Sequence, residues 1–374
     1  FMKIKILKKD VYEVLSKLQT IAGRKTNLAI TTAVLITTND SGINIISTDL
    51  ETGFIGFYPA EIESEGTIAI NAKKLFEIIK DFPGEEIYIN EIENFWIEIL
   101  NKNNVNYKMA GMNPEDFPGI PDVENIEYFD LKASVFKDMI EKTNFIPGST
   151  EEKRAHINGI FFEKLLDEGV NKLRLVSTDG SRLAKVDCEY ENISGVPEEP
   201  GIIISKKGLG DLYKFLETEE NIKIGYNSTN FVLKKEKETV IIRLLEGNFP
   251  EYKYIIDIKD SFNIIIERQK LLMMLKRMSI FTTDNFKGVI FNLEKGDLLV
   301  SSTNPELGEA KENLQINYEL DSLEIAFNVR YFIETLNVIE DNNVNLMLKD
   351  EKSPCLIEGE KNKNFLSVIM PMRI

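Results

Sequence analysis

The feature that most constrains the fold of this chain is an internal repeat. Three stretches share an apolar run, then Ser-Thr followed by Asp or Asn, a turn and a second run; they are INIISTDLETGFIG (43–56), LRLVSTDGSRLAKV (173–186) and LLVSSTNPELGEAK (298–311). Around them, helical periodicity and strand-like runs recur in the same order. The sequence therefore predicts an α+β protein of three tandem copies of about 120 residues, each built as helix, strands, helix, strands.

Two amphipathic helices are predicted in each copy from apolar residues at helical spacing. The first helices cover 10–23, 132–146 and 267–281, and the second helices cover 73–81, 206–217 and 330–340. A segment with a proline closes each copy, at Pro118, Pro250 and Pro371. Acidic, proline-bearing linkers near 125–130 and 250–260 predict domains at 2–126, 127–252 and 253–374.

Composition excludes several classes of protein. The chain has 374 residues, of which 43% are hydrophobic and 28% charged, as in globular proteins. Neither a membrane span nor a signal-peptide pattern is found, and Cys188 and Cys355 stand alone in strand-like runs, so we expect reduced thiols and a cytoplasmic location. A single histidine, His156, removes most zinc sites and histidine-based nucleophile systems. No phosphate-binding or dinucleotide-binding glycine motif is present.

The charge of the chain is unevenly distributed. A formal net charge of −16 by itself argues against nucleic-acid binding. The six predicted helices nevertheless contain more Lys and Arg than Asp and Glu, so the rest of the chain is still more acidic. Lysine is a good helix former, but glutamate is equally good and plentiful here without dominating these helices. The pattern favours helices that form one basic surface facing a polyanion.

The whole chain resembles the bacterial DNA sliding clamps, the β subunits of DNA polymerase III. Six pieces carry the resemblance in order: INGIFFE (157–163), STDGSRLA (177–184), EGNFPEY (246–252), NFKGV (285–289), FNVRY (327–331) and VIMPMRI (368–374). The resemblance implies three copies of the clamp fold, with strands outside and two helices inside per copy. It also implies a head-to-tail homodimer that closes into a ring around double-stranded DNA.

The function implied by this resemblance is tethering rather than catalysis. A ring holds a polymerase at high effective concentration near the primer end, and contacts to the DNA backbone carry no sequence information. The implied partners are the polymerase III alpha subunit, the clamp loader and other proteins that carry a clamp-binding peptide. No catalytic residue, metal or cofactor is expected.

The resemblance assigns roles to three groups of residues. The candidates for contacting DNA are Arg24, Lys73, Lys74, Lys206 and Lys207. The candidates for the dimer contact between domains 1 and 3 are Tyr107, Ile280 and Phe281. The candidates for a partner-peptide cleft between domains 2 and 3 are Ile157, Thr178, Gly180, Arg182, Leu183, Pro250, Ile255, Asn328, Tyr331, Val368, Met370, Pro371, Met372 and Arg373.

Methionine suits a surface that accepts different peptides, because its side chain is unbranched and polarizable. The chain departs from its relatives at the rim of this cleft and in the loop that touches DNA. Ser181 replaces a histidine, Tyr254 replaces an arginine, and Lys352 and Pro354 lie where a smaller, more apolar edge is usual. Ala155–His156 replaces an aromatic pair.

Three other interpretations fit parts of the pattern. A generic α+β protein with repeated hairpins accounts for the repeat alone. A hydrolase that uses two carboxylates on an acidic scaffold needs one carboxyl group with a raised pKa, and the repeat gives no reason for one. An outer-surface binding protein of repeated β units is disfavoured because no signal peptide is recognised.

Overall fold

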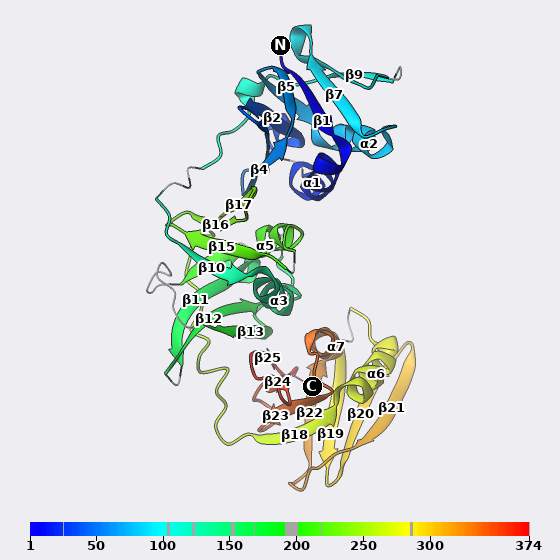
Figure 1. Cartoon of the computed structure of the whole chain (residues 1–374). Coiled ribbons are helices and arrows are strands. Elements are labelled where there is room, and N and C mark those ends of the chain that lie inside the picture. Colours follow the sequence, from blue (N-terminus) through cyan, green and yellow to red (C-terminus); the bar gives the residue numbers. More distant parts are fainter. Residues whose placement is uncertain are drawn as a thin grey trace. The chain divides into compact units, whose positions relative to one another are not determined.

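The computed structural model describes all residues of the chain except 25, 103, 104, 122, 124, 150, 152, 153, 168, 191–200, 218, 285, 286 and 374. The described residues form two compact units. Unit 1 contains residues 1–137 and 207–244, and unit 2 contains residues 138–190, 201–206 and 245–374. The middle copy of the repeat therefore contributes to both units, whose elements are labelled in Figure 1.

Unit 1 contains two antiparallel sheets. The five-stranded sheet has the order β5-β1-β7-β8-β9, with β1 (Lys3–Leu7), β5 (Glu61–Ser64), β7 (Glu86–Glu91), β8 (Trp96–Leu100) and β9 (Asn106–Ala110). The eight-stranded sheet has the order β10-β15-β16-β17-β4-β3-β2-β6, with β2 (Ala33–Asn39), β3 (Gly42–Thr48), β4 (Thr52–Pro59), β6 (Thr67–Asn71), β10 (Tyr128–Lys132), β15 (Asn221–Tyr226), β16 (Asn230–Lys234) and β17 (Glu238–Arg243). Because β17 pairs with β4, copies 1 and 2 of the repeat share this sheet.

Unit 2 repeats this arrangement with copies 2 and 3. Its eight-stranded sheet has the order β14-β11-β12-β13-β25-β24-β23-β18, with β11 (Gly159–Asp167), β12 (Val170–Thr178), β13 (Arg182–Glu189), β14 (Ile202–Ser205), β18 (Phe262–Glu267), β23 (Asn343–Leu348), β24 (Cys355–Gly359) and β25 (Phe365–Ile369). Its four-stranded sheet has the order β21-β20-β19-β22, with β19 (Gly288–Glu294), β20 (Asp297–Asn304), β21 (Gly308–Gln315) and β22 (Leu323–Asn328). Here β13 pairs with β25.

Each copy supplies two half-sheets of equivalent order. One set is β1-β7-β8-β9, β10-β15-β16-β17 and β18-β23-β24-β25, and the other is β6-β2-β3-β4, β14-β11-β12-β13 and β22-β19-β20-β21. The last strand of the first set pairs with the last strand of the second set in the preceding copy, as β17 with β4 and β25 with β13. Among the described residues, only β9 and β21 of these six end strands lack that pairing and lie at sheet edges.

The six predicted helices are confirmed, with ends shifted by a few residues. They are α1 (Lys8–Ala22), α2 (Ala72–Asp81), α3 (Ala133–Asn144), α5 (Lys206–Tyr213), α6 (Arg268–Met278) and α7 (Val329–Val338). Shorter elements are α4 (Ala155–Asn158) and the 3₁₀ turns η1 (Ala29–Thr32), η2 (Glu93–Phe95), η3 (Pro114–Asp116) and η4 (Ser279–Phe281). Helix α5 ends earlier than predicted because bonds such as Phe215 N to Leu212 O tighten the chain into turns.

Local sequence explains where these helices begin and which face they bury. The Asn71 side chain accepts a hydrogen bond from Lys74 N at 3.0 Å, and the Asn328 side chain accepts one from Arg330 N at 3.1 Å, so both asparagines cap helices. The buried residues of α1 lie at helical spacing and include Val11, Leu15 and Leu18. Helix α1 contacts α2, and α6 contacts α7, so these four helices pack in two pairs (Figure 1).

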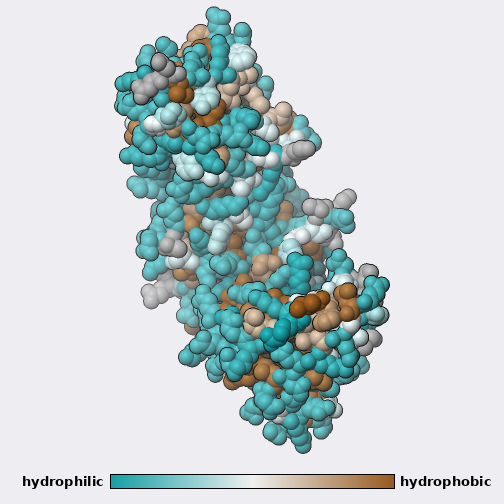
Figure 2. Space-filling view, turned by 90° about the vertical axis from the view of Figure 1, so that its right-hand side faces the viewer, coloured by the Kyte–Doolittle hydropathy of each residue, from teal (hydrophilic) through white to brown (hydrophobic). Residues whose placement is uncertain are grey.

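One face of the molecule is mostly polar. Figure 2 shows one face, on which hydrophilic residues predominate and hydrophobic residues form small separate groups. None of the helices in the described part of the chain is long and apolar enough to cross a membrane.

Candidate functional site

A tight turn between β12 and β13 lies at the centre of the predicted peptide cleft, within unit 2. The Thr178 hydroxyl donates to Arg182 O at 2.7 Å and accepts from Gly180 N at 3.1 Å, while the Asp179 carboxylate accepts from Ser181 N at 3.0 Å and Arg182 N at 3.1 Å. Gly180 has φ +90°, which favours glycine. The turn is therefore held rigidly by its own side chains.

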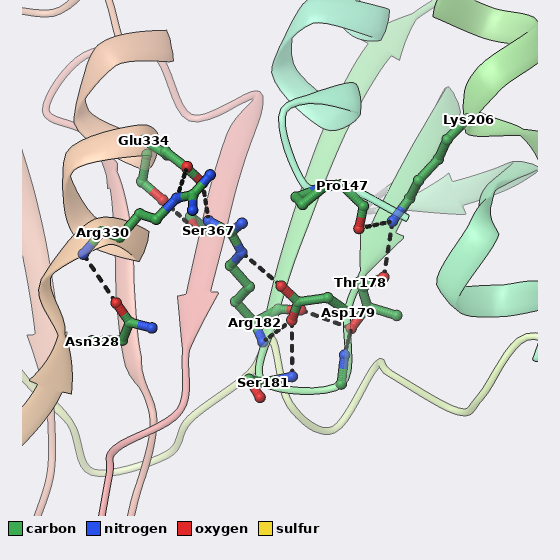
Figure 3. Close-up of polar contacts among 12 residues, drawn as sticks. Pro147, Thr178, Asp179, Ser181, Arg182, Lys206, Asn328, Arg330, Glu334 and Ser367 are labelled. Atoms are coloured by element: carbon green, nitrogen blue, oxygen red, sulfur yellow. Dashed lines mark hydrogen bonds and ion pairs between the residues drawn. The ribbon is translucent and has the colours of Figure 1, made fainter. Parts of the chain in front are cut away.

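The Arg182 side chain connects this turn to helix α7. It is only 3% exposed, and its guanidinium donates to the Asp179 carboxylate at 2.9 Å and to the Glu334 carboxylate at 2.6 Å (Figure 3). The guanidinium also lies 4.1 Å from the centre of the Tyr331 ring, in cation–π contact. Burial alone would raise the pKa of Glu334, but hydrogen bonds from Arg330 and Arg182 lower it, so the carboxylate stays charged.

The C-terminal segment continues from β25 across the same turn. Met370 N donates to Ser181 O at 3.0 Å, and Met372 N donates to Ala326 O at 2.8 Å. The side chains of both methionines are exposed. Residues 370–373 form one wall of a groove of about 750 Å³, whose other lining residues are Glu324, Ile325, Ala326, Glu351 and Lys352. A second hollow of about 600 Å³ adjoins Arg182, Asn328 and Tyr331.

An apolar cluster supports this surface from below. Leu183 pairs with Val368 across β13 and β25, and both are buried together with Tyr252 against the partly buried Ile255. The Tyr252 hydroxyl donates to the Glu163 carboxylate and accepts from Arg174, which makes a two-fold ion pair with Asp187 at 2.6 and 2.8 Å. This buried polar network fixes the segment after Pro250, because each of its members has a charged or hydroxyl partner.

The fourteen predicted cleft residues thus divide into two layers. Ile157, Thr178, Leu183 and Val368 are buried and support the surface, and Arg182 is buried but also lines the second hollow. Gly180, Pro250, Ile255, Asn328, Tyr331, Met370, Pro371, Met372 and Arg373 are exposed or half-buried and are available to a ligand. The sequence interpretation missed Glu324, Glu334 and Glu351, because acidic residues are too common in this chain to stand out.

The structure does not agree with the prediction that Lys206 faces DNA. Its side chain is only 6% exposed, and its ammonium donates to Thr178 O at 3.0 Å and to Pro147 O at 3.5 Å (Figure 3). These carbonyl groups turn the ammonium inward, towards the turn that contains Asp179. Burial lowers the pKa of Lys206 to about 8, against a smaller raising effect of Asp179.

This lowered pKa predicts a pH dependence of stability. Between about pH 8 and the ordinary lysine pKa of about 10.4, the unfolded chain binds a proton at Lys206 that the folded chain has released. The free energy of unfolding therefore gains a contribution as pH rises through this window and loses it as pH falls towards 8. Urea unfolding at pH 7.5 and at pH 9.5 measures this contribution. Between these two pH values, the free energy of unfolding of the wild type is expected to rise by more than that of Lys206→Met. The exposed Lys73→Met variant is the control, and an equal pH response of wild type and Lys206→Met would contradict the prediction.

The other predicted DNA contacts differ in how freely they are presented. In unit 1, Arg24 donates to Asp211 at 2.5 and 2.8 Å and to Asp49 at 2.8 Å, and Lys207 lies 3.0 Å from Asp49. Asp49 and Asp211 are buried, so they hold these two cations against the protein. Lys73 and Lys74 are exposed at the start of α2. Lys74 lies 2.8 Å from the Glu77 carboxylate of the same helix, but that carboxylate is exposed and competes less strongly with a phosphate than the buried Asp49 and Asp211. The two lysines of α2 are therefore better placed to meet a phosphate than Arg24 or Lys207.

The predicted dimer residues lie at or next to two edge strands, β9 and β21. Tyr107 is in β9 and is 39% exposed, with its ring 6.3 Å from that of Phe82. Ile280 is 69% exposed in η4, which contacts β20 and β21. The Phe281 ring packs over Gly308 of β21, at 3.4 Å from the place where a β-carbon of that residue would lie. Each group thus adjoins an unpaired edge strand.

Comparison with known proteins identifies the family. Family models of the DNA polymerase III beta subunit match the N-terminal domain at residues 2–121, the central domain at 130–251 and the C-terminal domain at 255–373. The sliding clamp (DNA polymerase III subunit beta) of Bartonella birtlesii, solved bound to griselimycin, is 30% identical with a TM-score of 0.93, and the match covers 100% of both chains. The chain belongs to the DNA polymerase III beta subunit family, the beta sliding clamps.

Other relatives extend this result. The beta sliding clamp of Chlamydia pneumoniae is 28% identical over 373 residues, covering 100% of this chain and 99% of the relative. The DNA polymerase III beta subunit of Pseudomonas aeruginosa is 26% identical in its crystal structure, with a TM-score of 0.91 and 100% coverage of both chains. As a member of this family, the chain is a DNA polymerase processivity factor without catalytic activity of its own. Family members are homodimeric rings that encircle DNA and bind the polymerase and other partners.

Proposed function

We propose that this clamp closes into a ring by pairing β9 of one protomer with β21 of its partner. The observation that carries this proposal is the repeated pairing of end strands, β17 with β4 and β25 with β13, which leaves β9 and β21 as the equivalent free edges. An unpaired edge strand is a template for strand addition. Two such contacts join two protomers head to tail and close the ring.

The repeat also supplies a register for this contact. The same backbone hydrogen bond occurs once in each copy, from Met112 N to Ala69 O, from Leu245 N to Ile203 O and from Met372 N to Ala326 O. The residues four positions before these donors are therefore equivalent, and they are Lys108, Ile241 and Val368. Ile241 lies opposite Gly53, and Val368 lies opposite Leu183. In copy 3, the residue equivalent to Gly53 and Leu183 is Glu309, which pairs with Thr303. Lys108 therefore faces Glu309 of the partner protomer, and Tyr107 faces Ala310.

The Lys108–Glu309 pair provides a test of the register. Lys108→Glu places two like charges opposite each other and is expected to weaken dimerisation roughly tenfold or more. Adding Glu309→Lys restores an opposite-charge pair and with it most of the affinity. Analytical ultracentrifugation measures the dimer dissociation constant, with Lys295→Glu in the β19–β20 turn as the matched charge control. A double variant no stronger than Lys108→Glu alone would show that these residues do not face each other.

The DNA-facing surface is proposed to centre on Lys73 and Lys74, with Arg24 and Lys207 as weaker contributors because they pair with the buried carboxylates of Asp49 and Asp211. Reversal of Lys73 and Lys74 to Glu is expected to weaken binding to a short duplex and to reduce the slope of log affinity against log salt by about two, one for each lost phosphate contact. Fluorescence anisotropy at several salt concentrations measures both quantities, with Lys349→Glu as control. An unchanged slope would rule out the two lysines as phosphate contacts.

The partner-peptide surface is proposed to comprise the exposed residues of the 178–182 turn, the segment 250–255, the start of α7 and residues 370–373. The apolar methionines next to the groove suit an apolar peptide side chain, and Arg373 and Lys352 provide cationic groups at its edge. The three proposed domains are 2–126, 127–252 and 253–374. The proposed location is the cytoplasm, where chromosomal DNA is replicated in bacteria.

A further inference from the structure

Two consecutive aromatic residues are exposed at the turn between β7 and β8 in unit 1. Phe95 is 42% exposed, and Trp96, the only tryptophan of the chain, is 41% exposed. Phe95 also has φ +59°, a left-handed backbone that is unfavourable for a bulky side chain. A glycine at this position would relieve the strain, so folding alone does not account for the phenylalanine. The turn therefore presents two large apolar groups to solvent at a cost in stability.

Trp96 lies one strand away from the free edge strand β9. It pairs with Ala110 across β8 and β9, so the two side chains lie on the same face of the sheet. The Lys108 ammonium lies 6.0 Å from the centre of the Trp96 ring, and the small side chain of Ala110 does not cover that ring. A strand added to β9 would therefore bring the residue opposite Ala110 within reach of the Trp96 ring.

The two junctions within the chain show which residue takes that place. Arg243 N donates to Glu51 O at 2.8 Å, and Met370 N donates to Ser181 O at 3.0 Å. In each junction the donor comes two residues after, and the acceptor two residues before, the facing pair that sets the register of the ring contact. The last turn residue but one before the paired return strand thus lies opposite the end strand of the next copy.

The same rule identifies the facing residues at the ring junction. Lys108 faces Glu309 of the partner protomer in the proposed register, so Ala110 faces Leu307 of the partner protomer. Leu307 is 54% exposed. The register therefore brings an exposed leucine of one protomer next to the exposed Trp96 of the other, with only an alanine between them.

The junction of copies 1 and 2 shows that these places border one space. By strand pairing, Thr229 and Asn230 of copy 2 take the places of Phe95 and Trp96. Together with Glu51 of copy 1, they line a groove of about 350 Å³. The corresponding places at the ring junction hold two aromatic rings and a leucine, which are large and apolar enough to fill such a groove.

We propose that Trp96, flanked by Phe95, packs against Leu307 of the partner protomer, and that this apolar contact is buried at both junctions where the ring closes. The surface that the strained turn exposes is thus covered by a second copy of the chain. Aromatic side chains are enriched in the buried centre of interfaces, because they bury a large area. The inference rests on the strand pairing proposed above for ring closure.

The single tryptophan makes this contact directly measurable. Fluorescence emission of the full-length protein is recorded while the protein is diluted through the dimer dissociation constant that sedimentation gives. Tryptophan emits at shorter wavelength when water is excluded from its ring. We therefore expect the dimer to emit at shorter wavelength than the monomer, and its emission to be quenched less by iodide.

Leu307→Ala tests which residue of the partner covers the ring. We expect this variant to weaken the dimer roughly tenfold or more, because each ring loses two apolar contacts, and to move the emission of the remaining dimer towards that of the monomer. Leu320→Ala is the matched control, because Leu320 is 51% exposed in the same unit. The control is expected to change neither the dimer affinity nor the emission.

The outcomes separate this contact from the strand pairing. Identical emission of monomer and dimer, or a Leu307→Ala dimer with unchanged affinity and emission, would overturn the contact. Either result leaves the strand pairing in place if the Lys108–Glu309 charge reversal restores the dimer. Failure of that charge reversal would overturn the strand pairing and this contact together.

Discussion

Deletion of residues 370–374 is expected to abolish binding of a clamp-binding peptide from the polymerase III alpha subunit while leaving the dimer intact. Met370, Pro371 and Met372 form one wall of the groove, and two of them have exposed apolar side chains. Interface residues of this kind that lie at the centre of a contact cost about 2 kcal/mol or more each when truncated. We therefore expect the affinity of a fluorescein-labelled peptide to fall at least about a hundredfold.

The dimer survives because the deletion begins after the last strand. Strand β25 ends at Ile369 and keeps its pairing with β13, and neither β9 nor β21 includes a deleted residue. Shortening the chain by residues 373 and 374 alone is the matched control, and it is expected to cost far less affinity. Fluorescence anisotropy measures peptide binding, and sedimentation measures the dimer. Unchanged peptide affinity after the full deletion would mean that the binding surface lies elsewhere.

Local features of the sequence were sufficient to predict the repeat and its helices. Thr48, Thr178 and Thr303 each lie at or next to the end of a strand that leads into a turn, as the repeat indicated. Helices α2 and α7 begin after Asn71 and Asn328, because capping and helical periodicity depend on residues only three or four positions apart. The proline that closes each copy also follows a strand in copy 3, where Pro371 comes after β25.

The pairing between copies was not predictable in the same way. Strands β17 and β4 are far apart in the sequence, and no local pattern states which edge strands meet. The burial of Lys206 was missed because its ammonium is bonded to carbonyl oxygens of Pro147 and Thr178, which belong to other segments. Likewise, a lysine or arginine on a basic helix gives no sign of a distant buried carboxylate such as Asp211, which binds Arg24.

These differences change which cations the clamp can offer to DNA. Lys206 is part of the support of the 178–182 turn, and Arg24 with Lys207 joins copy 1 to copy 2 inside unit 1. Lys73 and Lys74 remain exposed. Affinity for linear DNA is therefore expected to be weak, since three of the five candidate cations are held by groups of the protein itself and the net charge is −16. Stable association must then come from the closed ring.

The claim that only the closed ring holds the clamp on DNA is tested most directly by comparing its retention on circular and linear DNA. The protein is loaded by its clamp loader on a nicked circular plasmid, and the complex is separated from free protein by gel filtration, before and after the plasmid is cut once. We predict that the clamp stays on the closed circle and slides off the ends after linearisation, because only topology holds it. Equal retention on the two forms would contradict the account, since it would show that direct contacts hold the protein on DNA.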